Sequence, residues 1–185
     1  MKYNEYKLSR DTSWQILIDC GVRELPVKPT HICRQLGIDV RYYEPNDNVS
    51  GVATIVDGKP IILINKNDST ARKRFTCAHE LWHILNGDVG KYNVVSREPS
   101  LSDNPIEQAA NVFASRLLAP ACVLWGIGVS TAEEVSNICD ISIQAATFRY
   151  ERLKILLERN KFLSSPLERK VMHQFKRYIH KNKIK

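Results

Sequence analysis

Short alternating patterns of apolar residues in this chain give way to longer helical ones. Residues 38–43 alternate between apolar and polar positions, as a half-buried strand does. The apolar runs 51–56 and 60–65 flank the tripeptide Asp-Gly-Lys at 57–59, which is a strong signal for a β-hairpin. These segments predict a small β-sheet of about three strands.

Helical periodicity dominates the rest of the chain and predicts a mainly helical α+β fold. The most regular segment begins after Ser69 or Thr70, either of which can cap it, and Gly87 is well placed to end it. Asp103 is the expected N-cap of another helix, in which Pro105 is tolerated in the first turn. The other helices are expected over 11–20, 30–36, 131–139 and 142–158.

Two histidines on the most regular helix form the main chemical signal. His79 and His83 stand four residues apart in His-Glu-Leu-Trp-His, so both project from nearly the same helix face toward one ion. Zn²⁺ accepts neutral imidazole as a ligand, and Glu80 can take a proton from a water held there. Two polar histidines on a solvated face are the alternative. Apolar positions such as Phe75 and Leu81 anchor the helix in a core and favour the metal site.

A catalytic zinc needs a third protein ligand and an open position for water. Asn86 and Val89 stand where one class of zinc peptidase has glycine and a third histidine, which excludes that class. A glutamate from a second helix is the other common ligand. Glu107 is the only carboxylate inside the helix expected after Asp103, although a lone helical glutamate usually faces solvent. Weaker candidates in loop-like or terminal sequence are Asp88, Glu98 and Asp103.

Two blocks of the sequence resemble those of a known peptidase family. Residues 74–85 resemble the R-F-T-x-A-H-E-L-x-H core of the ImmA/IrrE family of metallo-endopeptidases, and residues 107–120 resemble its E-x-x-A-N-x-F-A-x-x-L-L-x-P block. The resemblance extends over residues 25–155. It implies a zincin-like zinc protease whose substrate is a helix-turn-helix (Xre-type) transcriptional repressor. Such repressors are often encoded beside the protease, on a mobile element or in a stress-response operon.

The expected site therefore has His79, His83 and Glu107 as zinc ligands and Glu80 as the catalytic base. Asn111 is a candidate to orient an imidazole. Departures from the family pattern remove no ligand: Trp82 replaces a frequent glycine and can narrow a helix contact or the cleft, and Ala119 replaces the usual methionine. Sequence does not choose the donor to the developing oxyanion among His31, Tyr92, Tyr150, His173 and His180.

The strand 60–65 is expected to hold the substrate as an added β-strand, with a purely structural strand as the alternative. A rival for the whole protein is a binding module: a repressor-binding or DNA-binding regulator with a zinc site and no proteolysis. The expected domains are a peptidase domain over 1–125, a helix-turn-helix-like subdomain over 126–160 and a basic C-terminal helix over 161–185.

Charge concentrates at the C-terminal end. Residues 161–185 carry eight of the 27 Lys and Arg residues but one of the 20 Asp and Glu residues. This composition is typical of a basic arm that binds DNA, or a DNA-bound repressor, electrostatically. An apolar stripe instead favours a helix that packs on the body and leaves its cations in water. The stripe consists of Leu167, Val171, Phe175, Tyr178 and Ile179.

The segment 126–160 has the outline of a helix-turn-helix. Residues of its second helix that can reach DNA are Gln144, Thr147, Arg149 and Arg152. The segment is near-neutral to acidic, however, and such a unit binds phosphate poorly. A structural role or repressor docking is therefore favoured over direct DNA binding.

Composition points to a cytoplasmic location. The chain has 185 residues, 43% of them hydrophobic and 25% charged, as in an ordinary globular protein. No continuous apolar run approaches the roughly 20 residues that span a bilayer, and the N-terminus has no apolar signal core. The five cysteines form no C-x-x-C pair, which favours reduced thiols. The oligomeric state does not follow from the sequence.

Overall fold

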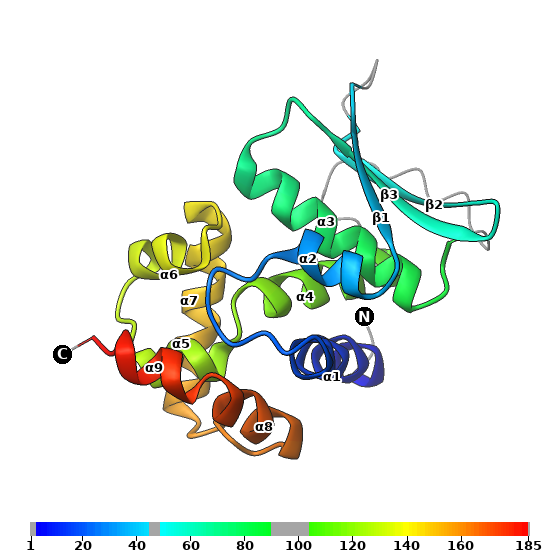
Figure 1. The fold of residues 1–185 in the computed structure, drawn as a ribbon. Helices are drawn as coiled ribbons and strands as arrows, with labels where there is room; N and C mark the ends of the chain where they lie inside the picture. Colours follow the sequence, from blue (N-terminus) through cyan, green and yellow to red (C-terminus); the bar gives the residue numbers. More distant parts are fainter. Residues whose placement is uncertain (1–2, 45–48, 90–103, 185) are drawn as a thin grey trace. The chain divides into compact units, whose positions relative to one another are not determined.

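A computed structural model describes residues 3–44, 49–89 and 104–184 of the chain (Figure 1). Its fold is α+β and mainly helical, with a three-stranded mixed sheet, as predicted. The chain divides into two compact units. Unit 1 comprises Met1–Ser9 and Lys28–Ala114, and unit 2 comprises Arg10–Val27 and Ser115–Lys185.

The sheet of unit 1 contains β1 (Asp39–Tyr43), β2 (Gly51–Val56) and β3 (Lys59–Asn65), in the order β1-β3-β2. β3 pairs antiparallel with β2 and parallel with β1. Asp57 and Gly58 connect β2 to β3 with φ angles of 50° and 74°. Two central residues with positive φ make the tight hairpin turn that matches the twist of its strands, so the predicted hairpin is confirmed.

The prediction that residues 60–65 hold a substrate strand is wrong. These residues belong to β3, which is the central strand and is hydrogen-bonded to a neighbour on each side. An added peptide needs a free edge, and β3 has none. The hairpin was visible locally, but the parallel pairing with β1 that covers the other side of β3 was not.

Helix α3 (Thr70–Leu85) runs along the sheet of unit 1, and α2 (Pro29–Gln35) packs against α3 (Figure 1). Ser69 caps α3 by accepting a hydrogen bond from the Arg72 backbone N–H at 3.2 Å. The approach of α3 to β2 is close at Gly51. A Cβ atom there would lie 2.5 Å from Cγ2 of Thr76 and 2.7 Å from the carbonyl oxygen of Leu63.

Helix α4 (Pro105–Leu118) begins in unit 1. The Asn104 side chain accepts a hydrogen bond from the Ile106 N–H at 3.0 Å and so acts as a cap, while the expected cap, Asp103, lies outside the described residues. Trp82 packs on Phe113 of α4, with ring centroids 5.3 Å apart, and is only 2% exposed. The bulky indole thus fills the contact between α3 and α4.

Helix α1 (Tyr3–Asp19) begins eight residues earlier than the sequence pattern predicts. Its early turns contain two fully buried serines, which break the apolar periodicity. Ser9 donates its hydroxyl to the carbonyl oxygen of Glu5 at 3.0 Å, and Ser13 donates to that of Arg10 at 2.7 Å. Hydroxyls satisfied by the helix backbone can be buried at little cost, which is why the pattern missed this start.

Unit 2 consists mainly of helices, including the paired α6 (Ala132–Cys139) and α7 (Ile143–Glu158). Arg149 of α7 is buried and donates from Nε to the carbonyl oxygen of Ala119 at 2.6 Å. It is therefore unavailable to DNA, which agrees with the structural role favoured over DNA binding for this segment. The other helices of this unit are α5 (Ala121–Ile127), α8 (Pro166–Gln174) and α9 (Lys176–Lys181).

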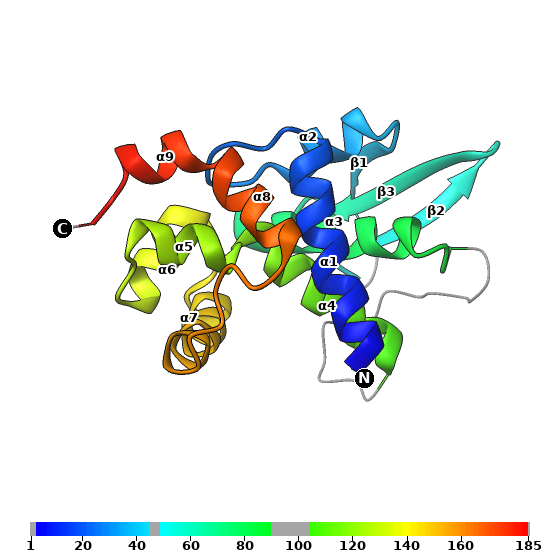
Figure 2. The ribbon, with the colours of Figure 1, turned by 90° about the horizontal axis from the view of Figure 1, so that it is seen from below.

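The predicted packing of the C-terminal stripe is confirmed. Val171, Phe175 and Ile179 are buried, and α8 and α9 follow one another over α5 (Figure 2). By length and composition one helical stretch, Pro105–Ile127, is apolar enough to cross a membrane. Most of its apolar window, 72%, is buried inside the protein, as expected for core helices.

Candidate metal centre

The two histidines of α3 point to one place. His79 and His83 lie one helical turn apart, and their Nε2 atoms approach to 3.1 Å. Both side chains belong to the buried part of α3, at 7% and 1% residue exposure. A helix packed on a sheet therefore holds both imidazoles in fixed positions, as a metal site requires.

Glu107 of α4 completes the cluster. Its Oε2 lies 3.1 Å from Nε2 of His79, and its Oε1 lies 3.5 Å from Nε2 of His83. Ligands about 2.0 to 2.1 Å from a tetrahedral zinc ion are about 3.3 to 3.5 Å from each other. The three donor groups, which lie within 4.8 Å of one another, thus have the spacing that such an ion needs.

A helix-ending turn places an acceptor behind His83. Helix α3 ends in a Schellman motif at Gly87, whose φ is 70°. The N–H of Gly87 donates to the carbonyl oxygen of Ile84, and the N–H of Asp88 donates to the carbonyl oxygen of His83. This turn of the backbone brings Oδ2 of Asp88 to 3.2 Å from Nδ1 of His83. A carboxylate accepts, so Nδ1 carries the proton and Nε2 presents its lone pair. Asn86 donates to the other oxygen of Asp88 at 2.8 Å.

Asn111 has the same role for His79, as expected from the sequence. Its amide Oδ1 lies 3.0 Å from Nδ1 of His79. Asn111 follows Glu107 by one turn of α4, so one helix face contacts both nitrogens of the ring. An acceptor at Nδ1 fixes the proton there and directs the Nε2 lone pair toward Glu107.

The donors of the site fit a cation. Two Nε2 lone pairs and a carboxylate converge, an arrangement that repels itself unless a positive charge lies between them. The close contact with His79 lowers the pKa of Glu107, against the opposing effect of burial, so this side chain remains an anion. Its side chain is 24% exposed, which leaves the cluster accessible from one side.

Glu80 lies between the histidines and β2, which is an edge strand of the described sheet. It is fully buried, and Oε2 accepts a hydrogen bond from the backbone N–H of Ala53 at 2.9 Å. The N–H of Asn65 donates to the carbonyl oxygen of Ser50, so Ser50 faces β3. By alternation, Ala53 turns its N–H and C=O away from β3. The carboxylate of Glu80 is therefore fixed at the side of β2 that faces away from β3.

Cys77 belongs to the core rather than to the metal cluster. Its Sγ lies 3.7 Å from Sγ of Cys33 in α2, and both residues are fully buried. The contact with Cys33 and burial raise the pKa of Cys77 well above its usual range. A buried thiol with a raised pKa is unreactive, so Cys77 supports the back of α3.

The structure sorts the remaining sequence candidates. Asp88, a rival third ligand, instead orients His83, a role that the sequence reasoning missed although a helix-ending Gly87 followed by Asp was a usable signal. The N–H of Ala53 was also missed, because no pattern in the sequence brings β2 to Glu80. Three further candidates lie outside the described residues: Tyr92, Glu98 and Asp103.

Comparison with known proteins agrees with this geometry. The family described as IrrE N-terminal-like domain matches residues 33–127, just over half of the chain. The matched segment contains His79, Glu80, His83 and Glu107. No curated protein matches the chain.

Proposed function

The chain belongs to the ImmA/IrrE family of metallopeptidases, and we propose that it is a zinc-dependent endopeptidase that cleaves a helix-turn-helix (Xre-type) transcriptional repressor. One observation carries the catalytic part of the proposal. His79, His83 and Glu107 converge at metal-ligand spacing with Glu80 on the same helix as the histidines. Cleavage of the repressor would release the genes of a mobile element or a stress response.

Each residue of the site has a separate role in the proposed peptide hydrolysis. Asp88 and Asn111 hold the two imidazoles so that their Nε2 atoms face the ion. A bound zinc ion supplies Lewis acidity, polarising the scissile carbonyl and making water more acidic. Glu80 accepts the proton of the attacking water and then delivers it to the leaving amine. Its fixed position at the β2 edge keeps it beside the bond to be cut.

The side of β2 that faces away from β3 is the proposed binding site of the substrate. Gly51, Ala53 and Ile55 alternate with the residues bonded to β3, so their backbone N–H and C=O groups face outward. A peptide added to this edge would pair with the outward groups of Gly51 and Ile55 and would pass the carboxylate of Glu80, to which the N–H of Ala53 is already bonded. Backbone pairing leaves the choice of substrate to side-chain contacts, and the helical unit 2 is our candidate for repressor docking.

We place this activity in the cytoplasm, where repressors reside. All five cysteines are free, and four of them are buried. Such thiols suit a reducing compartment.

The decisive experiment combines metal content with cleavage of a helix-turn-helix repressor encoded beside this chain, comparing wild type with Glu80→Gln. We expect one zinc per chain in both proteins and a cut only by the wild type. Loss of a catalytic base typically lowers the rate by about 10² to 10⁴-fold. Asp57→Asn, in the exposed hairpin turn, makes the same type of change and should leave cleavage intact.

The rival reading predicts different results. A binding module would bind the repressor without cutting it, and Glu80→Gln would retain the full effect on repressor function. Zinc and repressor binding without any cut, in either protein, would therefore contradict the peptidase proposal. A cut that persists in Glu80→Gln would reject the role of Glu80.

A further inference from the structure

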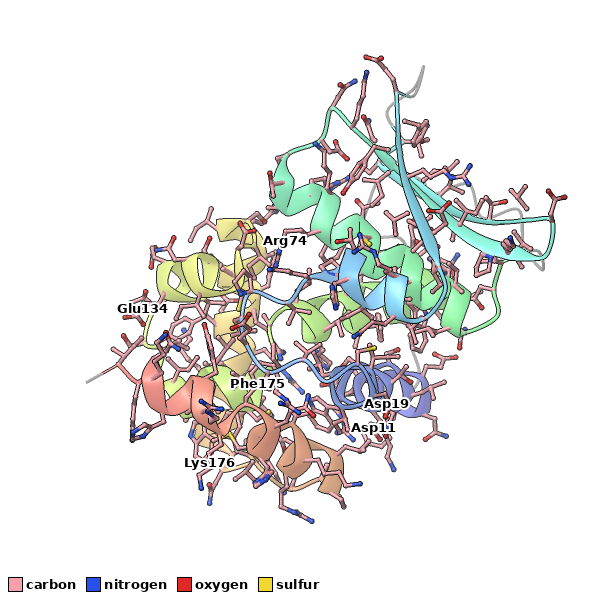
Figure 3. All side chains as sticks on the ribbon, viewed as in Figure 1. Asp11, Asp19, Arg74, Glu134, Phe175 and Lys176 are labelled. Atoms are coloured by element: carbon pink, nitrogen blue, oxygen red, sulfur yellow. The ribbon has the colours of Figure 1, made fainter. Side chains whose placement is uncertain are left out.

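The C-terminal helices present cations that no acidic side chain of their own segment offsets. Each described Lys and Arg between residues 161 and 184 is exposed, seven in all, together with His173 and His180. The segment has one carboxylate, Glu168, which is 3% exposed and turned into unit 2. Phe175 and Lys176, labelled in Figure 3, illustrate the division between the buried stripe and the exposed cations.

These cations stand on a fixed surface of unit 2. Gly126 of α5 permits a close approach, since a Cβ atom there would lie 2.7 Å from the Met172 side chain and 3.1 Å from that of Ile179. Gln174 donates from Nε2 to the carbonyl oxygens of Leu17 and Val22, each at 2.6 Å. A surface anchored in this way loses little conformational entropy when it binds a partner.

Two grooves flank this surface and share a ridge formed by Arg169, His173 and Lys176. The grooves have volumes of about 760 and about 750 Å³. No Asp or Glu occurs among the described residues that line either groove. The first groove adds Arg23, Lys170 and Arg177 to the shared ridge, and the second adds Trp125, His180 and Lys183.

We propose that the basic face of α8 and α9, with its two grooves, binds the phosphate backbone of a nucleic acid. Cations that line two grooves with a shared ridge suit a polyanion such as a chain of phosphates, and binding releases the counterions of that chain. The second groove also offers a flat apolar surface. Trp125 is 37% exposed and stacks on Phe162, with ring centroids 4.9 Å apart and planes 8° apart. Sugar and base rings pack on such surfaces, whereas acidic side chains do not use them.

This proposal is independent of the peptidase proposal, because it concerns different residues and a binding measurement without cleavage. Arg149 of α7, in the helix-turn-helix outline, is buried, and no residue of α7 is among the described residues that line the two grooves. The basic face is therefore expected to contact phosphate and not to read bases with a helix, as a sequence-specific repressor does. Binding should depend strongly on salt and weakly on sequence.

The test measures the affinity of the full chain for a labelled duplex of about 20 base pairs, and for its single strand, between about 50 and about 200 mM salt. The test variant is Lys170→Gln/Lys176→Gln/Arg177→Gln. The matched control is Lys7→Gln/Lys59→Gln/Arg159→Gln, which removes the same charge from exposed positions outside both grooves. Melting temperatures of both variants verify that they are folded.

We expect the test variant to bind at least about tenfold more weakly, and its slope of log affinity against log salt to fall by about two to three units. The control should bind within about twofold of wild type at low salt. A second measurement needs no variant: bound nucleic acid should protect Lys170 and Lys176, but not Lys7 and Lys59, from acetylation.

Three results would overturn the proposal. The first is equal weakening in the test and control variants, which would show an effect of net charge alone. The second is wild-type protein that fails to bind either nucleic acid at about 50 mM salt. The third is competition by polyglutamate as effective as that by unlabelled DNA, which would assign the face to an acidic protein. Duplex and single strand compared side by side distinguish the two forms of the ligand.

Discussion

The residues behind the candidate metal ligands determine which atoms of the two imidazoles face the candidate site. Asp88 and Asn111 each bind Nδ1 of one histidine, at 3.2 and 3.0 Å, and thereby direct both Nε2 atoms toward Glu107. These two residues come from different elements, a turn after α3 and the second turn of α4. Loss of a side chain that orients a ligand typically lowers metal affinity or activity by about 10- to 100-fold.

Replacing Asp88 by Ala should weaken zinc binding about 10- to 100-fold, because His83 loses the acceptor that fixes its tautomer and ring orientation. Titration against a fluorescent zinc chelator measures the change. Asp39→Ala is the control, since Asp39 is exposed and pairs with Arg41 of the same strand. An affinity unchanged in Asp88→Ala would mean that packing alone orients His83.

Trp82 is the residue that departs most in size from the family pattern, and it lies against Phe113. Trp82→Ala should reduce the free energy of unfolding by about 3 to 5 kcal/mol, because a large cavity remains between α3 and α4. Trp82→Phe should cost less than about 1.5 kcal/mol, since the indole N–H has no hydrogen-bond partner among the described residues. Urea denaturation measures the free energy of unfolding of both variants. An equal decrease in Trp82→Ala and Trp82→Phe would show that the indole N–H has a hydrogen-bond partner.

At the scale of elements, the position of Glu80 depends on the contact of α3 with β2. Gly51 permits this contact, because both a side chain of α3 and a carbonyl oxygen of β3 occupy the space of a Cβ atom. Two residues further along β2, Ala53 binds the carboxylate of Glu80. The strand therefore acts both as part of the core and as the support of the proposed catalytic base.

Gly51→Ala should lower the free energy of unfolding by about 1 to 3 kcal/mol through overpacking. It should also reduce peptidase activity more than zinc content, because β2 must shift away from α3 while the ligands are on α3 and α4. Thermal melts, zinc content and cleavage assays measure the three effects. Thr54→Ala on the same strand is the control; equal effects in both variants would contradict the steric argument.

At the scale of the whole molecule, the candidate metal site joins segments that are distant in sequence. The ligands on α3 and α4 are 24 residues apart from His83 to Glu107, and the residues 90–103 between them are not described. An ion that binds the folded chain and not the unfolded chain stabilises the fold by mass action. The metal is thus expected to contribute to stability as well as to catalysis.

Removal of zinc with a chelator should lower the melting temperature. At a free zinc concentration about 100 times the Kd, the stabilisation lost is about 2.7 kcal/mol. His83→Ala should melt at a temperature that does not respond to added zinc, which makes it the control for non-specific effects of the chelator. A wild-type melting temperature independent of zinc would argue against a metal site in the folded chain.

The sequence by itself determined the features that depend on local spacing. Helical periodicity predicted that His79, Glu80 and His83 lie on one helix, and the Asp-Gly turn predicted the hairpin. The C-terminal apolar stripe predicted which side of α8 and α9 is buried. Each signal arises within a few residues, because the helix repeat and turn geometry are properties of the local backbone.

Only the tertiary structure decided which strand is central, what orients each histidine and where Glu80 lies. The parallel pairing of β1 with β3 left β2, and not residues 60–65, as an edge beside Glu80. Asp88, Asn111 and Ala53 reach the site from three different elements. Such contacts join residues far apart in the chain and depend on how helices and strands pack, which local spacing does not encode.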